Sequence, residues 1–312
     1  MPEVLSVASF FSGVGGIDLA FNNAGFSVVF ANELDANACK TYKENFNSLL
    51  VSDDINNLNP ADIPATDVIV GGFPCQAFSI AGYQKGFADP RGNLFFSLAK
   101  IISIKKPKAI FFENVKNLAR HDNGKTLQTI INCLEQLGYH IKYKVLNAYQ
   151  YGNIPQNRER IYIVGFLNKS SCDAFEFPEE IPLTQSVVSF IDIFLGDPKY
   201  FYTKQNFSYF DKLMPMDFLK IYQWRRVYLR KNKKGLCPTL TANMGTGGHN
   251  VPLVKTVLGI RKLSPRECFS LMGFPRTFKL PRISNTQLYK QAGNAVVVPV
   301  VKRIAEEIKK VL

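Results

Sequence analysis

A cysteine that could act as a nucleophile follows a short apolar run and two glycines in residues 67–76, DVIVGGFPCQ. Residues 67–70 are typical of a buried strand, and the glycines allow a tight turn after it. Cys75 would then stand above the edge of a sheet, where α/β enzymes hold reactive side chains. A lone free cysteine is more often a small buried hydrophobe, so the residues expected around Cys75 decide between these interpretations.

A carboxylate and two arginines are expected at the same edge. Glu113 closes an apolar run at 109–113, and Arg158 and Arg160 lie in QNRER, where another strand begins. A carboxylate beside a thiolate would raise the pKa of the thiol, so the pair must serve something more specific. A glutamic acid can donate a hydrogen bond to a ring nitrogen while the thiolate of Cys75 attacks the ring. The arginines would favour the thiolate and bind a flipped base or its phosphate, although alone they could be a solvated charge cluster.

A glycine-rich loop, FFSGVGG at residues 10–16, follows the first predicted strand and precedes a helix. Asp18 stands where a dinucleotide fingerprint needs its third glycine, and no Gly-Lys-Ser/Thr follows, so pyrophosphate binding is disfavoured. Glu33, 20 residues beyond Gly13, could accept hydrogen bonds from a ribose diol, and Asp54 could reach an adenine amino group. The set fits S-adenosylmethionine, although turn glycines and helix-capping acids would give the same pattern.

These side chains need a sheet whose strands end at one edge. Short apolar runs alternate with helical patterns through the first half of the chain, which predicts a parallel sheet with helices on both faces. The expected strands are 6–11, 27–32, 67–70, 109–113, 141–146 and 160–166, and the expected helices are 17–24, 36–45, 94–104 and 125–137.

The alternation ends after the last of these strands, and a polar, proline-punctuated stretch at 168–184 marks a boundary. We expect residues 181–284 to form a smaller, mostly β or irregular domain. Residues 1–180 with 285–312 would form the catalytic and cofactor-binding domain, on which a helical pattern at 295–311 packs back.

Composition narrows the function classes. The formal net charge of +13 suits a nucleic-acid partner. The six cysteines lie far apart with no C-x-x-C pair, and the three histidines are scattered, so we expect no metal and no disulfide framework. No apolar run approaches the roughly 20 residues that span a bilayer. The first residues lack a secretory pattern, so we expect a cytoplasmic protein with no membrane partner.

Six groups of motifs extend the pattern beyond single residues. They are FSGVGG (11–16), GFPCQ (72–76), FENV (112–115), QNRER (156–160), RKLSPREC (261–268) with MGFP (272–275), and QAGNAV (291–296). In this order they resemble the motifs of DNA cytosine-5 methyltransferases of the bacterial and phage restriction–modification type. The match runs from residue 6 to about 300 and leaves mainly 170–235 uncovered.

The resemblance implies a Rossmann-like methyltransferase fold with a smaller target-recognition domain. It implies site-specific transfer of a methyl group from S-adenosyl-L-methionine to carbon 5 of a flipped cytosine, leaving S-adenosyl-L-homocysteine. Carbon 5 is too weak a nucleophile until a thiolate adds to carbon 6, so the reaction needs covalent catalysis. A monomer acting on double-stranded DNA, with a cognate restriction endonuclease in the same system, is the implied setting.

The resemblance also implies roles for individual residues. Cys75 would add to carbon 6, Glu113 would protonate or hydrogen-bond ring nitrogen 3, and Arg160 with Arg158 would hold the activated base. The residues that would surround S-adenosylmethionine are Phe11, Gly13, Gly15, Glu33, Leu34, Asp54, Ile55, Leu94, Asn294 and Val296. The residues that would contact DNA are Pro74, Gln76, Thr239, Leu240, Thr241, Arg225 and Arg226.

Target reading would fall to the smaller domain. The basic and aromatic stretch 224–234 suits phosphate and base contacts, although Trp224, Val227 and Tyr228 could equally be core. Residues 77–92 would close over the DNA as a lid, or would be an ordinary surface loop.

Two other functions fit parts of the pattern. A tRNA cytosine methyltransferase of the same superfamily would have a differently built segment after Pro-Cys-Gln, where this chain has AFSIAG at 77–82. A catalytically inactive DNA-binding protein would not need Cys75, Glu113 and Arg160 together. A methyl-transfer assay on DNA and tRNA separates the first case, and covalent trapping by 5-fluorocytosine DNA separates the second.

Overall fold

A computed structural model describes residues 4–74, 94–225, 227–246 and 251–312 of the chain. Cys75, Gln76, Arg226 and the expected lid at 77–92 lie outside these residues.

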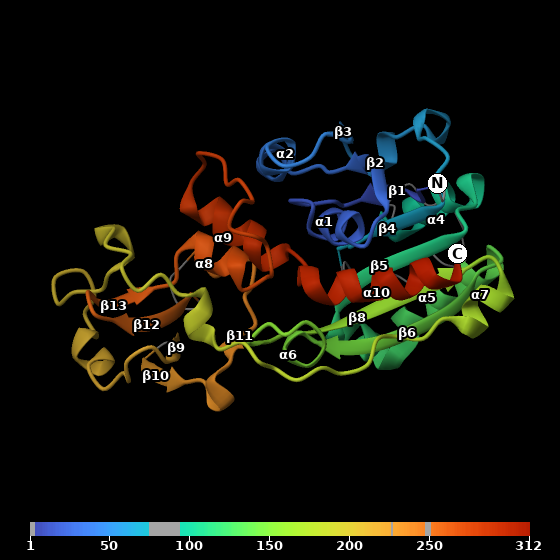
Figure 1. The fold of residues 1–312 in the computed structure, drawn as a ribbon. Helices are drawn as coiled ribbons and strands as arrows, with labels where there is room; N and C mark the ends of the chain where they lie inside the picture. Colours follow the sequence, from blue (N-terminus) through green and yellow to red (C-terminus); the bar gives the residue numbers. More distant parts are fainter. Residues whose placement is uncertain (1–3, 75–93, 226, 247–250) are drawn as a thin grey trace. The chain divides into compact units, whose positions relative to one another are not determined.

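The chain divides into two compact units (Figure 1). Unit 1 comprises Met1–Leu146, Glu159–Glu179 and Val300–Leu312, and unit 2 comprises Asn147–Arg158 and Glu180–Pro299. Residues 147–158 and 285–299, which the sequence analysis grouped with the catalytic domain, thus lie in unit 2.

Unit 1 is built on a seven-stranded sheet. In spatial order its strands are β3 (Leu49–Val51), β2 (Ser27–Asn32), β1 (Ser6–Phe10), β4 (Val68–Gly71), β5 (Ala109–Val115), β8 (Glu159–Phe166) and β6 (His140–Asn147). The five strands from β3 to β5 pair in parallel, whereas β8 pairs antiparallel with β5. The predicted α/β sheet is confirmed, but it is mostly rather than wholly parallel. The segment between β6 and β8 holds no helix long enough for a crossover, so β8 enters in the opposite direction.

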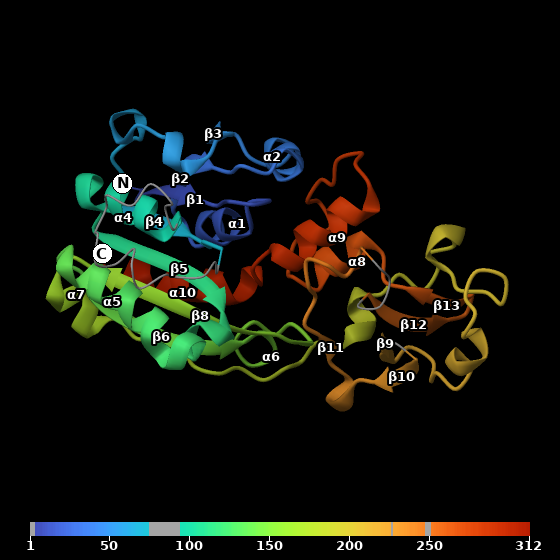
Figure 2. The same ribbon diagram turned by 180° about the vertical axis from the view of Figure 1, so that it is seen from behind.

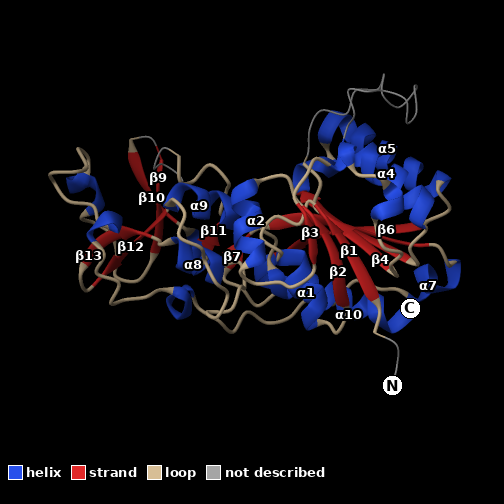
Figure 3. Ribbon diagram, turned by 90° about the horizontal axis from the view of Figure 1, so that it is seen from above, coloured by secondary structure: helices blue, strands red, loops and turns tan. Residues whose placement is uncertain are grey.

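Helices cover both faces of this sheet, as predicted. They are α1 (Gly16–Asn23), α2 (Ala36–Lys43), α4 (Leu94–Lys105), α5 (Lys125–Gln136), α7 (Lys169–Ala174) and α10 (Val298–Val311). α10 and α1 lie in front of the sheet in Figure 1, and α4 and α5 lie in front of it in the reverse view of Figure 2. Figure 3 shows the sheet between these two pairs. Lys309 near the end of α10 donates to the carbonyl oxygens of Ala24 and Gly25, which ties α10 to the end of α1.

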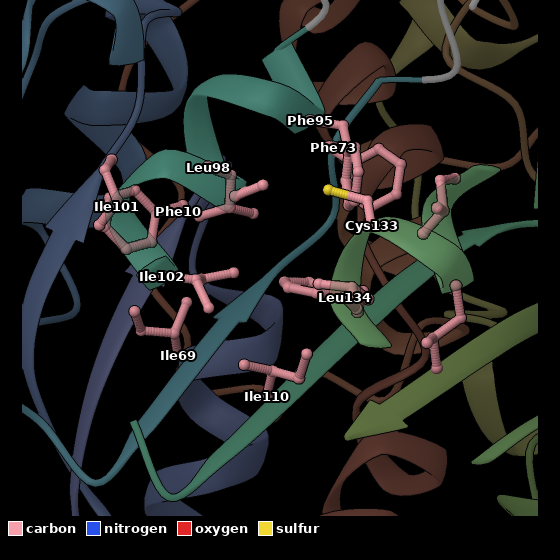
Figure 4. Close-up of a cluster of buried hydrophobic side chains, with 14 of the residues drawn as sticks. Phe10, Ile69, Phe73, Phe95, Leu98, Ile101, Ile102, Ile110, Cys133 and Leu134 are labelled. Atoms are coloured by element: carbon pink, nitrogen blue, oxygen red, sulfur yellow. The ribbon is translucent and has the colours of Figure 1, made fainter. Parts of the chain in front are cut away.

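The main core of unit 1 fills the space between the sheet and helices α4 and α5 (Figure 4). Phe10, Ile69 and Ile110 come from the strands, and Leu98 and Leu134 come from the helices. All five are 0% exposed. This packing fixes the strands whose ends carry the candidate site.

Unit 2 contains two small sheets. In spatial order β10 (Tyr228–Lys231), β9 (Ile221–Arg225), β12 (Pro252–Thr256) and β13 (Gly259–Lys262) form an antiparallel sheet. β7 (Gln156–Asn157) and β11 (Cys237–Pro238) pair in parallel. Among its described residues, unit 2 also contains the α-helices α6 (Ala148–Tyr151), α8 (Pro265–Ser270) and α9 (Asn285–Asn294).

A buried ion pair explains most of the RKLSPREC motif. Arg261 is 0% exposed, and its two terminal nitrogens lie 2.9 and 2.7 Å from the carboxylate oxygens of Glu267. The same guanidinium donates to the carbonyl of Asp192, and Ser264 caps α8 in a capping box with Glu267. Because burying a charge is costly unless the charge is paired, the matched Arg261 and Glu267, with the Ser264 cap, serve the fold of unit 2.

The unit 1 core generates a first prediction. Leu98→Ala removes a fully buried side chain, and the cavity should lower the free energy of unfolding by about 2–5 kcal/mol. Lys100→Ala, an exposed position on the same helix, should change it by less than about 0.5 kcal/mol. Urea unfolding followed by circular dichroism measures both, and equal effects would show that α4 does not bear on this core.

Candidate active site

The candidate site lies where the parallel strands of unit 1 end. Because β3, β2, β1, β4 and β5 run in the same direction, their carboxyl ends meet at one edge of the sheet. The chain winds outward from β1 toward β3 and, in the other direction, from β4 toward β5. Ligands of open α/β sheets bind at such a reversal point.

The glycine loop after β1 needs glycine at two positions. Gly13 and Gly15 have φ of +56° and +84°, values that residues with a β-carbon seldom adopt. A β-carbon at Gly15 would lie 2.2 Å from the ring of Phe46, whereas one at Gly13 would project into open space. Phe11 enters the loop with φ of +53°. The loop therefore has a backbone face at Gly13 that a ligand can approach closely.

Glu33, at the end of β2, holds this loop. Its carboxylate oxygens accept hydrogen bonds from the backbone N–H groups of Gly13 at 2.8 Å and of Asp35 at 2.7 Å. Asp35 in turn caps α2. Glu33 is thus both a loop organiser and an acid beside the open face of Gly13.

The other residues expected near the cofactor follow the neighbouring strands. Asp54 comes after β3 and accepts from the N–H of Asn56, so it caps the short helix Ile55–Asn57. Ile55 is 3% exposed, whereas Leu34 is 64% exposed. Leu94 is the first residue of α4 and is half-buried. Leu34, Asp54 and Ile55 follow strands, and Leu94 begins a helix. All four lie in unit 1, at the same edge of the sheet.

Asp18 lies beneath the loop, in a buried polar network. Its oxygens accept from the hydroxyls of Ser9 at 2.8 Å and Tyr42 at 2.7 Å, and Ser12 donates to Ser9. Burial raises the pKa of Asp18 to about 6, and the two hydroxyls offset part of that rise. The residue that breaks the dinucleotide fingerprint therefore supports the loop from inside.

Glu113 and Arg160 form an ion pair at the end of β5. Arg160 Nε lies 3.1 Å from Glu113 Oε1, and the two side chains are 15% and 11% exposed. Antiparallel pairing of β5 with β8 sets Val115 opposite Arg160, which brings the two strand ends together. The guanidinium of Arg160 also donates to the carbonyl of Glu159.

The segment that leads to Cys75 is fixed beside this pair. The side chain of Asn114 donates to the carbonyl of Phe73 at 2.9 Å, and Phe73 is buried. A β-carbon at Gly72 would lie at an ordinary contact distance of 3.6 Å from Glu113 Oε2, which places the backbone of this segment beside the carboxylate. Pro74, the last described residue of this segment, is exposed. Asn114 lies in the FENV motif, although the sequence alone does not predict this role for it.

The position of Arg158 differs from the one expected for a residue that holds the base. It lies in unit 2, is 2% exposed, and donates to the carbonyls of Leu240 at 2.7 Å, Gly293 at 3.0 Å and Ala295 at 2.8 Å. A guanidinium engaged by three carbonyls cannot also clamp a base. Arg158 joins three motifs that are distant in the sequence, and Gly293, which the prediction omitted, belongs to this cluster.

The Thr-Leu-Thr segment, residues 239–241, packs against β7, which immediately precedes Arg158. Thr239 donates to the carbonyl of Asn157 at 2.7 Å, and the N–H of Leu240 donates to the side chain of Gln156. Leu240 is 0% exposed, so its side chain does not face DNA as expected, while Thr239 and Thr241 are half-buried. A β-carbon at Gly293 would lie 2.2 Å from the backbone of Thr241, which explains the glycine of QAGNAV.

The remaining predicted residues also lie in unit 2. Asn294, the last residue of α9, is exposed, Val296 is 5% exposed, and Arg225 is exposed on β9. Trp224 is 5% exposed and therefore belongs to the core, whereas Val227 and Tyr228 are each 56% exposed.

Two further observations concern the described residues only. They contain no cluster of three histidine, cysteine, aspartate or glutamate side chains that could hold a metal ion. None of the described helices combines the length and the apolar character that crossing a bilayer requires.

The fold and site define an α/β enzyme with a carboxylate–guanidinium pair at the carboxyl edge of its sheet. Residues 5–310 match the family model of the C-5 cytosine-specific DNA methylases. The chain is 56% identical to the type II methyltransferase M.Bsp6I of Bacillus sp. (strain RFL6), over 98% of this chain and 99% of that protein. It is 40% identical to the type II methyltransferase M.NlaX of Neisseria lactamica, over 99% and 97%.

A solved structure shares the fold. A DNMT2 mutant of Spodoptera frugiperda superposes with a TM-score of 0.76 at 20% identity, over 98% of this chain and 99% of that one. The chain belongs to the C-5 cytosine-specific DNA methylase family, and it is a DNA cytosine-5 methyltransferase.

The Asp18 network generates a second prediction. A carboxyl whose pKa is higher in the folded than in the unfolded chain contributes most stability below pH 4, and that contribution is lost as pH rises to about 6. Asp18→Asn should remove this part of the pH dependence, which corresponds to roughly 3 kcal/mol. Urea unfolding of both proteins between pH 4 and 7 measures the difference, and parallel pH curves would contradict the burial effect.

Proposed function

We propose that Cys75 is the nucleophile that adds to carbon 6 of a cytosine flipped out of duplex DNA. The observation that carries the proposal is the Glu113–Arg160 pair beside Gly72–Pro74, the segment that ends one residue before Cys75. A carboxyl group at the end of the strand next to the nucleophile can donate to an acceptor ring nitrogen when it is protonated and accept from an exocyclic amine.

In the proposed reaction each residue has a separate task. The thiolate of Cys75 forms a bond to carbon 6, and Glu113 donates a hydrogen bond or proton to ring nitrogen 3, so that carbon 5 becomes nucleophilic. Arg160 orients Glu113 and contacts the activated base. Loss of the proton from carbon 5 and elimination of Cys75 then release the methylated base. The base must leave the duplex stack to reach these groups.

S-adenosyl-L-methionine, when bound, supplies the methyl group and leaves as S-adenosyl-L-homocysteine. The residues present fit it, because Gly13 has open space before its backbone and two carboxylates, Glu33 and Asp54, end neighbouring strands. Phe11, Gly15, Leu34, Ile55 and Leu94 would complete the cradle, with Asn294 and Val296 contributing from unit 2. No metal ion is part of the proposal.

Unit 2 is proposed to recognise the target. Thr239 and Thr241 would contact the DNA strand, together with Pro74 and Gln76 from unit 1, Arg225 on β9, and Arg226. Leu240 and Arg158 would instead position this segment, because both side chains are buried. The formal net charge of +13 supports a polyanionic substrate.

We propose that the enzyme acts as a cytoplasmic monomer and as the modification component of a restriction–modification system. Support comes from the type II methyltransferases to which it is 56% and 40% identical. A cognate endonuclease would recognise the same DNA sequence.

Cys75→Ser should reduce methyl transfer on the order of 1,000-fold or more, because a hydroxyl is a far weaker nucleophile than a thiolate. Binding of S-adenosylmethionine and DNA should survive. Transfer of labelled methyl groups to genomic DNA measures turnover, and DNA containing 5-fluorocytosine should trap only the wild type covalently. Cys172→Ser, a buried cysteine on α7, is the control. Transfer to tRNA alone would instead support the tRNA enzyme.

Glu113→Gln should slow methyl transfer roughly 100- to 10,000-fold, because the amide keeps the shape of the side chain but cannot supply a proton. Glu159→Gln is a matched control on the neighbouring strand, since its exposed carboxylate pairs only with Lys116 among the described contacts. Single-turnover rates on one duplex measure both. Equal rates for the two variants would remove Glu113 from the mechanism.

A further inference from the structure

The hairpin formed by β9 and β10 has two chemically different faces. Trp224 stands opposite Leu229, and Gln223 stands opposite Arg230. Because side chains alternate across a strand, Trp224 and Leu229 share one face, while Gln223, Arg225 and Arg230 share the other.

The first face is core. Trp224 lies with its ring centroid 5.2 Å from that of Phe207 and 5.3 Å from that of Tyr209. Leu229 packs on the same cluster. On this side the hairpin is anchored by apolar contacts. On the opposite face Gln223 is buried, whereas Arg225 and Arg230 are exposed.

The second face lines a cavity of about 550 Å³. Its lining includes three basic side chains, Arg225, Arg230 and Lys234, and the amides of Gln223 and Asn232. Thr239 and Thr241 line it as well, so the cavity adjoins the segment held by Arg158. No acidic side chain is among its described lining residues. Within the described part of the chain, neither Arg225 nor Arg230 forms an ion pair.

This set of groups is suited to base edges rather than to phosphate alone. A guanidinium donates two parallel hydrogen bonds, which matches atoms O6 and N7 of guanine in the major groove. Phosphate needs only donors, but the amides of Gln223 and Asn232 offer acceptors as well. A two-stranded ribbon is also narrow enough to enter the major groove.

We propose that this cavity is the base-reading site of the enzyme and that Arg225 and Arg230 recognise guanine edges within its target sequence. The inference rests on the proposed function and deepens it, because it assigns the chemical class of the bases that are read. Gln223 shares their face, opposite Arg230 and two residues before Arg225.

The first test uses the wild-type enzyme. Bisulfite sequencing of methylated genomic DNA gives the target sequence. Duplexes in which one guanine at a time is replaced by 7-deazaguanine then lose a single major-groove acceptor. We expect kcat/KM to fall roughly 5- to 150-fold at the guanines read by the arginines, as for the loss of a bidentate contact.

Two variants assign the contacts. Arg225→Lys and Arg230→Lys keep the charge but lose the fork, so each should relax preference at one base pair and leave the salt dependence of DNA binding unchanged. Lys231→Ala is the control, because Lys231 lies on the other face of β10, paired with Asp217, and should leave preference unchanged. A phosphate contact would survive the lysine variants and show no base preference.

The outcomes separate the two hypotheses. If the wild type methylates no DNA, the proposed function fails. If it methylates a defined sequence whose only G·C pair is that of the target cytosine, tolerates 7-deazaguanine at every position, or keeps its preference in both lysine variants, only the reading site fails. The 7-deazaguanine arm needs no variant, so misfolding of a substituted hairpin cannot leave the inference undecided.

Discussion

The common direction of five neighbouring strands is the constraint on which the site of unit 1 depends. Because β3, β2, β1, β4 and β5 run parallel, the loops that follow them meet at one edge. These strands carry, or are followed by, Gly13, Glu33, Asp54, Gly72 and Glu113. One arrangement of strands therefore gathers residues that are spread over positions 13–113 of the sequence. The antiparallel entry of β8 then adds Arg160, which parallel pairing would have carried to the opposite edge.

The acids of the site are used for structure as well as for chemistry. Glu33 accepts two backbone N–H groups and thereby shapes the loop that it would share with a ligand. Asp18 costs the fold some stability at neutral pH, since a buried carboxylate must ionise there. Its hydrogen bonds to Ser9 and Tyr42 give the glycine loop a rigid base, which suits a site that must hold its ligand in one orientation.

The sequence predicts what depends on local patterns. The strand expected at 27–32 is β2, and helices expected at 94–104 and 125–137 are α4 and α5 within a residue. The position of Glu113 at a strand end follows from the same periodicity. Arg158 could not be placed this way, because its partners lie 82, 135 and 137 residues further along the chain. The sequence pattern around Trp224 also could not distinguish core from surface. The two faces of the hairpin can be assigned only once the pairing register of its two strands is known.

The separation of duties on the β9–β10 hairpin has an evolutionary consequence. Trp224 and Leu229 secure the hairpin from one side, so substitutions at the exposed Arg225 and Arg230 carry little penalty in folding. Descendants of such a chain can change from one DNA target sequence to another through folded intermediates, while the catalytic unit stays unchanged.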